Sequence, residues 1–381
     1  MKVVTSIAVA GLTGFGAAAY AADPPADAPA AAAAPAAPTG PSLADVLTAS
    51  GLAVTGYVSA TYEHFSGVPT FRQFDVDRNS FSLNQAGVQI AYQPKEGFGG
   101  VLQLIAGNDA GIVNTAEGTG GSNFDVLQAY AQYVTGSWTI IGGKFLTAVG
   151  AEVIAPTGNT NISRSLTFYS EPLTHTGLRV TYAVNDQVSL FLGANNGWNI
   201  VHDNNNSKTV EFGASFTPNK MWSFAVQGYS GKEPTDAGVD GTRTIVDFVG
   251  TWNATDALTV ILNYDFGRQE NQLAGTVAKP ATRSATWNTG ALYVNYAINP
   301  TWRVSLRLEE LNDKDGLYFL TGTSQKVKEG TITVGYDPSK NFELRLEGRF
   351  DKSDKSTFLD SNGTSFNDNQ KSVALEALFK F

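Results

Sequence analysis

Short segments of alternating apolar and polar residues recur from residue 51 to the C-terminus, and this feature constrains the fold most. In the final stretch, KSVALEALFKF, apolar side chains occupy every second position, and the positions between them include Glu376 and Lys380. A strand with one apolar and one charged face separates two different environments. A soluble β-sandwich would show the same alternation, so no single strand decides the fold class.

The spacing of the breaks between these segments favours a transmembrane barrel. The segments are about ten residues long, which is the length that a tilted strand needs to cross a membrane. Their connections alternate between short turns, such as VTGS and INP, and long loops, such as HFSGVPTFRQFDVDRN. That layout, with an even number of strands and both termini on the short-turn side, is typical of outer-membrane barrels. We count sixteen candidate strands, at residues 52–62, 80–92, 98–107, 124–134, 137–145, 174–184, 187–195, 208–217, 221–230, 243–253, 257–267, 284–297, 301–311, 326–337, 341–351 and 371–381.

Composition and aromatic placement agree with this prediction of an all-β, antiparallel, up-and-down transmembrane barrel over residues 51–381. Charged residues make up 16% of the chain, against roughly 25% in soluble domains. Trp138, Trp222, Trp252 and Trp302 fall near the short-turn ends of their strands, where an aromatic girdle would lie. Ordinary packing within a sheet is the alternative explanation for these tryptophans.

The N-terminal 50 residues differ from the rest of the chain. Residues 1–21 have the pattern of a cleaved signal peptide, with Lys2, an apolar stretch and an A-x-A site at 19–21. Residues 22–50 are rich in Pro and Ala and predict a periplasmic linker that ends in a short helix capped by Ser42. Removing the signal would change the formal charge from −9 to −10, because only one Lys and no acid is lost. An acidic protein is a poor candidate for nucleic-acid binding.

One long loop, residues 146–173, interrupts the alternation between the fifth and sixth candidate strands. Loops of this length inside a compact domain usually have a function. We expect it to fold into the lumen and form a constriction, as rings of charged side chains do in channels. The alternative is that the loop lies outside the mouth and the wall charges only pair with one another. The candidate pore-lining residues are Glu152, Arg164 and Glu171 of the loop and Arg179, Arg303, Arg307, Arg345 and Arg349 of the wall.

The same region carries a resemblance to a known family. GKF at 143–145, GAE at 150–152, NTNISRS at 159–165, HTGLR at 175–179 and FDVDRNSFSLNQ at 74–85 resemble segments of the OmpL-like β-barrel porin family. The resemblance covers roughly residues 51–381 and implies a porin-like outer-membrane barrel without naming a substrate. The C-terminus is similar to the signal that such proteins present to the barrel-assembly machinery, here Val373, Leu375, Phe379 and Phe381.

The sequence offers little for catalysis or cofactor binding. Cysteine is absent, and His64, His175 and His202 are scattered without metal-ligand spacing. No nucleophile-elbow or phosphate-loop motif is present. We therefore expect no enzyme activity, no cofactor and no metal. Asp75 and Asp77, with the acidic loops at 203–206 and 313–315, could hold calcium, although such runs are more often solvated turns.

The prediction is therefore a porin of a Gram-negative outer membrane that passes small hydrophilic solutes or ions by diffusion. Its expected partners are membrane lipid, lipopolysaccharide, the barrel-assembly machinery and the solutes; a homotrimer is one arrangement open to it. Two alternatives stay open. One is a surface adhesin or structural barrel with a closed lumen, and the other is an outer-membrane enzyme built on a barrel.

Overall fold

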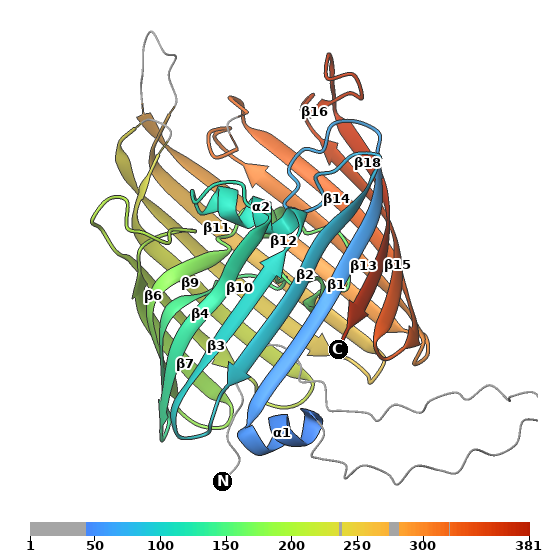
Figure 1. Ribbon diagram of the computed structural model, residues 1–381. Coiled ribbons are helices and arrows are strands. Elements are labelled where there is room, and N and C mark those ends of the chain that lie inside the picture. Colours follow the sequence, from blue (N-terminus) through green and yellow to red (C-terminus); the bar gives the residue numbers. More distant parts are fainter. Residues whose placement is uncertain (1–42, 236–237, 274–281, 320) are drawn as a thin grey trace, which may run out of the picture.

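Sixteen antiparallel strands close into one barrel (Figure 1), as the sequence predicts. The computed structural model describes residues 43–235, 238–273, 282–319 and 321–381. The predicted signal peptide, most of the linker and the Ser42 cap lie outside these residues. The wall strands are β1 (Leu52–Phe65), β2 (Ser80–Tyr92), β3 (Gly97–Ala106), β4 (Phe124–Thr135), β5 (Trp138–Leu146), β6 (Thr174–Ala183), β7 (Val188–Asn195), β8 (Thr209–Phe216), β9 (Trp222–Pro234), β10 (Asp240–Asn253), β11 (Leu258–Leu273), β12 (Thr282–Ala297), β13 (Trp302–Asp313), β14 (Gln325–Ser339), β15 (Phe342–Ser353) and β18 (Asn369–Lys380).

The first and last strands pair to close the barrel. The register places Tyr57 opposite Lys380 and runs on to Phe65 opposite Ser372. The backbones of Gly56 and Phe381 exchange two hydrogen bonds, of 3.0 and 2.9 Å. A Cβ at Gly56 would overlap the Phe381 ring, so a larger residue there would require that ring to move. The predicted sorting-signal side chains point outward, with exposed fractions between 44% and 59%, at Val373, Leu375, Phe379 and Phe381.

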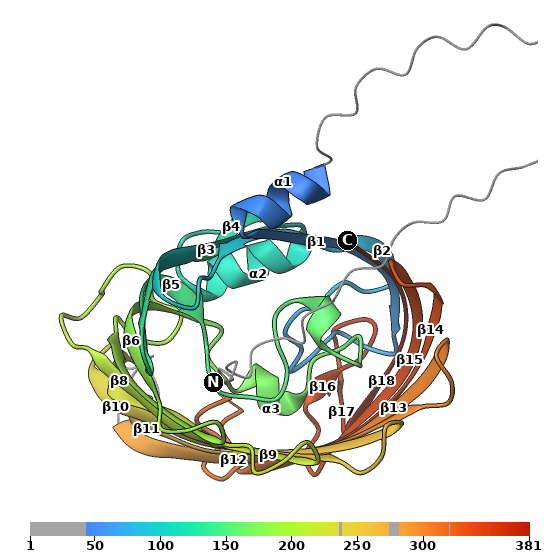
Figure 2. The same ribbon diagram turned by 90° about the horizontal axis from the view of Figure 1, so that it is seen from below.

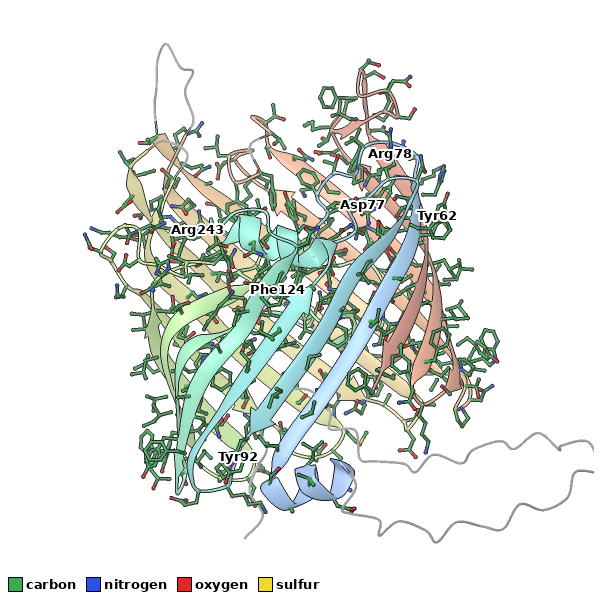
Figure 3. The ribbon with its side chains drawn as sticks, viewed as in Figure 1. Tyr62, Asp77, Arg78, Tyr92, Phe124 and Arg243 are labelled. Atoms are coloured by element: carbon green, nitrogen blue, oxygen red, sulfur yellow. The ribbon has the colours of Figure 1, made fainter. Side chains whose placement is uncertain are left out.

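The two faces of the wall have opposite character. On β15, Leu346 and Phe350 are 54% and 44% exposed, whereas Arg345 and Arg349 on the inner face are each 3% exposed. Aromatic rings stack on the outer face near the short turns, as Trp222 does with Trp252 at 5.5 Å between centroids. Figure 3 labels Tyr62 and Tyr92 near opposite ends of the wall. This is the arrangement of a lipid-facing apolar band bordered by aromatic residues.

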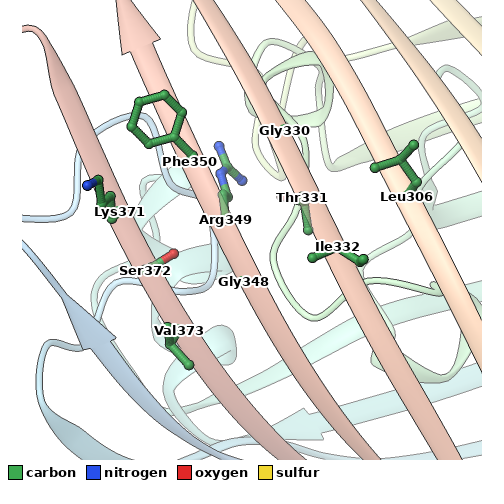
Figure 4. Close-up of a pocket in the computed structure, with 10 residues that line it drawn as sticks. All are labelled: Leu306, Gly330, Thr331, Ile332, Gly348, Arg349, Phe350, Lys371, Ser372 and Val373. Carbon is green, nitrogen blue, oxygen red and sulfur yellow. The ribbon is translucent and has the colours of Figure 1, made fainter.

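The outer wall is hollowed beside two glycines of β14 and β15. A Cβ at Gly348 would meet nothing within 4 Å, and one at Gly330 would meet only Leu308, at 3.6 Å. Figure 4 shows the apolar side chains around this groove, which include Leu306, Ile332 and Val373. These side chains are exposed on the lipid-facing side, so the groove lies off any path through the lumen.

Short helices and a small hairpin complete the fold: α1 (Leu43–Ser50), α2 (Asn108–Ala116), η1 (Pro156–Gly158), α3 (Leu166–Tyr169) and the two-residue strands β16 (Phe358–Leu359) and β17 (Phe366–Asn367). The sequence analysis missed α2 and treated it as loop. Its sequence contains Gly111 and has no clear apolar face, so contacts inside the barrel stabilise it instead: Ala110 and Val113 are fully buried. Among the described residues, no helix has the length and hydropathy needed to span a membrane.

Candidate functional site

The third long loop, residues 146–173, lies inside the ring of strands, as Figure 2 shows for α3. Its backbone N–H groups bond to side chains on several wall strands. Ala148 donates to the Tyr229 hydroxyl on β9 at 2.9 Å, and Ala151 donates to Asn263 Oδ1 on β11 at 2.7 Å. Ile162 donates to a carboxylate on β15, at 2.7 Å. The loop therefore crosses the lumen rather than capping its mouth.

Wall carboxylates satisfy the backbone donors of this irregular segment. Buried N–H groups outside regular structure need partners, since each unpaired one costs free energy. Glu347 accepts from the N–H groups of Ile162 and Ser163 at 2.7 and 3.0 Å. Glu309 accepts from Leu166 and Thr167 at 2.7 and 3.3 Å, at the start of α3. Acceptors placed there also match the positive end of a helix.

Arg307 is the centre of a buried ion network between the loop and the wall. Its side chain is 0% exposed and pairs with loop Glu152 at 3.0 Å and with Glu309 and Glu329 of the wall at 3.2 and 3.3 Å. Nη1 also donates to the carbonyl oxygen of Ser163 at 2.7 Å. Arg307 thus joins the loop to β13 and β14.

Further arginines donate to carbonyl groups of the loop, among them Arg303 to Thr160 O at 2.7 Å. Arg345 donates to Pro156 O at 3.1 Å and Arg349 to Arg164 O at 2.6 Å. Arg164 folds back within the loop and donates to Val153, Ile154 and Ile162 oxygens at 2.8–2.9 Å. Along β15, Arg345 also pairs with Glu343 at 2.8 Å, one of the wall salt bridges weighed as an alternative.

The predicted pore-lining set therefore separates into two groups. We expected all eight side chains to face a water path. Instead six are between 0% and 7% exposed: Glu152, Arg164, Glu171, Arg307, Arg345 and Arg349. Ion pairs account for Glu152, Arg307, Arg345 and Arg349. Arg164 instead donates to loop carbonyls, and Glu171 lies beside two wall aspartates. Only Arg179 and Arg303 keep part of their side chains in water, at 15% and 19%.

Arg179 and Arg303 are partly exposed, whereas the carboxylates that pair with them are buried. Arg179 Nε lies 2.8 Å from Glu211, whose side chain is 0% exposed, and its guanidinium packs over the Phe145 ring at 4.6 Å. Arg303 Nε donates to Glu343 at 3.0 Å, with the Glu343 side chain 4% exposed. At both places the guanidinium group is more exposed than the carboxylate that pairs with it.

Glu171 has a different environment from the other loop charges. It is 6% exposed, lies beside Asp247 and Asp265, and has no hydrogen-bond partner on either carboxylate oxygen. Burial, with the nearby charges of Asp247 and Glu152, raises its pKa well above the usual range. The sequence analysis identified Glu171 but not the two wall aspartates. The sequence indicated these two residues only through the alternation along β10 and β11, which assigns both to inward-facing positions.

Apolar contacts inside the barrel also position the loop, and the sequence analysis did not find them. Phe168 and Leu173 pack with Phe74, Ile105 and other residues of the first two long loops and the wall. A second cluster joins Leu166 to Phe71 and Phe358, and a third joins Val149 to Trp198 and Trp287. Several outer loops therefore converge on residues 146–173 within the lumen.

Asp109 on α2 gives this interior a dependence on pH. Its side chain accepts from Gln85 Nε2 at 3.0 Å, and burial raises its pKa from 3.8 to about 8 despite the opposing effect of Arg164. A carboxyl whose pKa is raised by folding holds its proton in the folded state. The stability it contributes is therefore complete below about pH 4 and is lost as pH rises through about 8.

We expect Asp109→Asn to remove this contribution. The amide keeps an acceptor for Gln85 but does not ionise, so the variant should gain stability over the parent as pH rises from 5 to 8. The temperature at which the folded band disappears in heat-modifiable gel mobility, measured across that range, tests this. A constant difference between the two proteins would show that folding does not raise the pKa of Asp109.

Comparison with known proteins gives the family. A model of the family "Putative beta-barrel porin-2, OmpL-like" matches residues 51–381, the whole barrel. This chain belongs to that family. It is accordingly a β-barrel porin of the outer membrane, as the sequence resemblance implied. No curated protein matches the sequence.

Solved porins share the fold of this family member at low sequence identity. The outer membrane channel DcaP of Acinetobacter baumannii has 16% identity and a TM-score of 0.59, covering 87% of this chain and 97% of that one. An anion-selective porin from Comamonas acidovorans has 12% identity and a TM-score of 0.60, covering 87% and 99%. The trimer form of Vibrio cholerae OmpT has 9% identity and a TM-score of 0.58, with the same coverage.

Proposed function

We propose that this porin passes small hydrophilic solutes by diffusion, with residues 146–173 as the element that narrows its lumen. The observation that supports this most directly is that the loop is bonded to β9, β11, β13 and β15, on several sides of the barrel. A sixteen-stranded barrel leaves an aqueous channel unless something fills it. A loop held against the wall on several sides sets the width of what remains.

The rest of the proposal follows from the export pattern and the fold. The chain would be delivered by a cleaved signal peptide at 1–21 and inserted by the barrel-assembly machinery through Phe381 and its neighbours. Lipid and lipopolysaccharide would surround the wall. One solved neighbour is described as a trimer form, which supports a homotrimer for this chain as well. The proposed role includes no catalysis.

Single-channel conductance in a planar bilayer tests the proposal. Protein of residues 22–381, refolded and shown by heat-modifiable gel mobility to be folded, should give discrete, stable current steps. Folded protein that gives no steps would instead favour the adhesin or structural barrel with a closed lumen. In that alternative, the three apolar clusters around the loop would fill the lumen and close it.

Selectivity should follow the two partly exposed arginines. Because the side chains of Arg179 and Arg303 are more exposed than those of Glu211 and Glu343, we expect a preference for anions. Changing either arginine to Gln should lower the anion-to-cation permeability ratio by at least about two-fold, read from the reversal potential in a salt gradient. Lys352→Gln, in an exposed pair with Asp368, is the matched control and should leave the ratio unchanged. Equal permeability ratios in all variants would show that other residues determine the selectivity.

A further inference from the structure

Three carboxylates meet where the end of the loop contacts the wall. Among the described residues, no Lys or Arg side chain forms an ion pair with them. They are Glu171 of the loop, Asp247 of β10 and Asp265 of β11. One oxygen from each lies within 4.8 Å of the others. None of the three appears in an ion pair formed within the described part of the chain.

The strand register forces the two aspartates together. Asp247 and Asp265 are direct partners on adjacent antiparallel strands, and both are 0% exposed. Like charges directly opposite one another destabilise a sheet. Burying them without compensation costs more, because the low dielectric strengthens their repulsion. Such a pair calls for a bound positive charge.

Neutral donors compensate only one of these carboxylates. Asp247 accepts from Gln227 and Asn263 at 2.8 and 2.6 Å and from the Gly150 N–H at 3.2 Å. Asp265 has a single 3.2 Å contact, from Asn263 to Oδ1, and its Oδ2 has no partner. Both oxygens of Glu171 also lack one. Three carboxylate oxygens are therefore buried and available.

A fourth, non-acidic oxygen stands beside the group. Thr289 on β12 is the direct strand partner of Asp265, is 0% exposed, and has no hydrogen-bond partner on its hydroxyl. Gly150, at φ 92°, makes room for the group, because a Cβ there would overlap the Glu171 carboxylate. Buried polar atoms without partners call for an explanation, and a cation bound between them would supply one.

We propose that Glu171, Asp247 and Asp265 bind a calcium ion that clamps the end of the loop to β10 and β11. Calcium takes hard oxygen ligands at about 2.3–2.6 Å and tolerates irregular geometry. Oxygens that all lie within 4.8 Å of one another can surround one such ion. Three negative charges with few donors match its charge, and waters would fill the remaining positions. The site is independent of the solute that the channel passes.

Calcium titration of the refolded barrel tests the proposal. Full-length mature protein in detergent, stripped with EDTA, is titrated with CaCl2 and with MgCl2 by calorimetry, and its gel-mobility transition is followed with and without calcium. We expect saturable binding of about one calcium per chain and a transition raised by at least about 5 °C. Binding should be weaker with magnesium, which demands near-ideal octahedral geometry.

Two variants separate the site from surface binding and from a fold defect. Without calcium, Glu171→Gln should be at least as stable as the parent because it removes repulsion; with calcium, the parent should become the more stable. Asp360→Asn, in an exposed loop, should keep the parent's response. The proposal is overturned if the parent shows no calcium response, which would favour a proton shared between the carboxyl groups. It also fails if Glu171→Gln responds as the parent does.

Discussion

Replacing Arg307 by Met should cost the folded barrel about 3–5 kcal/mol, the range measured when one partner of a buried ion network is removed. The cost arises because Glu152, Glu309 and Glu329 remain buried without the guanidinium that lies 3.0–3.3 Å from each of them. Urea unfolding in lipid or detergent, followed by gel mobility, measures it. The loop should also loosen, since Arg307 holds Ser163 O and Glu152 together.

Controls distinguish this network from charge changes in general. Arg268→Gln removes an exposed pair, 3.4 Å from Glu270, and should change stability by no more than about 1 kcal/mol. Adding Glu152→Gln to Arg307→Met should recover part of the lost stability, because the double variant buries one unpaired carboxylate fewer. If Arg307→Met unfolds at the same urea concentration as Arg268→Gln, the network does not hold the fold.

The barrel could be predicted from sequence because its rules are local. Alternation fixes which face a side chain takes, and turn residues fix where each strand ends, so Leu375 and Glu376 were assigned to opposite faces without any tertiary information. Such a rule fails for α2, whose helix depends on Ala110 and Val113 packing inside the barrel. A segment stabilised by distant contacts leaves little local pattern.

The site was predicted only in part, for a related reason. Alternation along the strand places Arg303 and Arg307 on the same inner face of β13. The Arg303 side chain is nevertheless 19% exposed, whereas that of Arg307 is 0% exposed. The difference comes from where the loop lies along the barrel axis, which no single strand encodes. The same holds for Asp247 and Asp265, which become neighbours of Glu171 only when the loop docks.

The charged side chains of the inner wall thus serve mainly to hold the loop in position. Carboxylates such as Glu347 accept from its N–H groups, while guanidinium groups such as that of Arg349 donate to its carbonyls. An irregular segment has both kinds of unsatisfied backbone group, and the alternating Glu and Arg residues of β15 supply both partners. Charge on this wall is therefore used for positioning, and less of it reaches the water path than the sequence suggested.

Removing the loop should have the largest effect on transport. The strands on either side still pair beyond their ends, since the Thr147 N–H donates to Leu173 O at 3.0 Å. A short Gly-Ser turn in place of residues 149–171 can therefore close β5 onto β6. Single-channel conductance should rise at least about two-fold, because the loop is bonded to the wall on several sides of the lumen.

A second shortened loop provides the control for this experiment. Residues 361–364 are exposed at the tip of the β16–β17 hairpin, and replacing them with a two-residue turn should leave conductance unchanged. The loop-free barrel should also lose ion preference, because the path widens beyond the reach of Arg179 and Arg303. Unchanged conductance in a folded loop-free barrel would show that other segments, such as α2 and the first long loop, set the width instead.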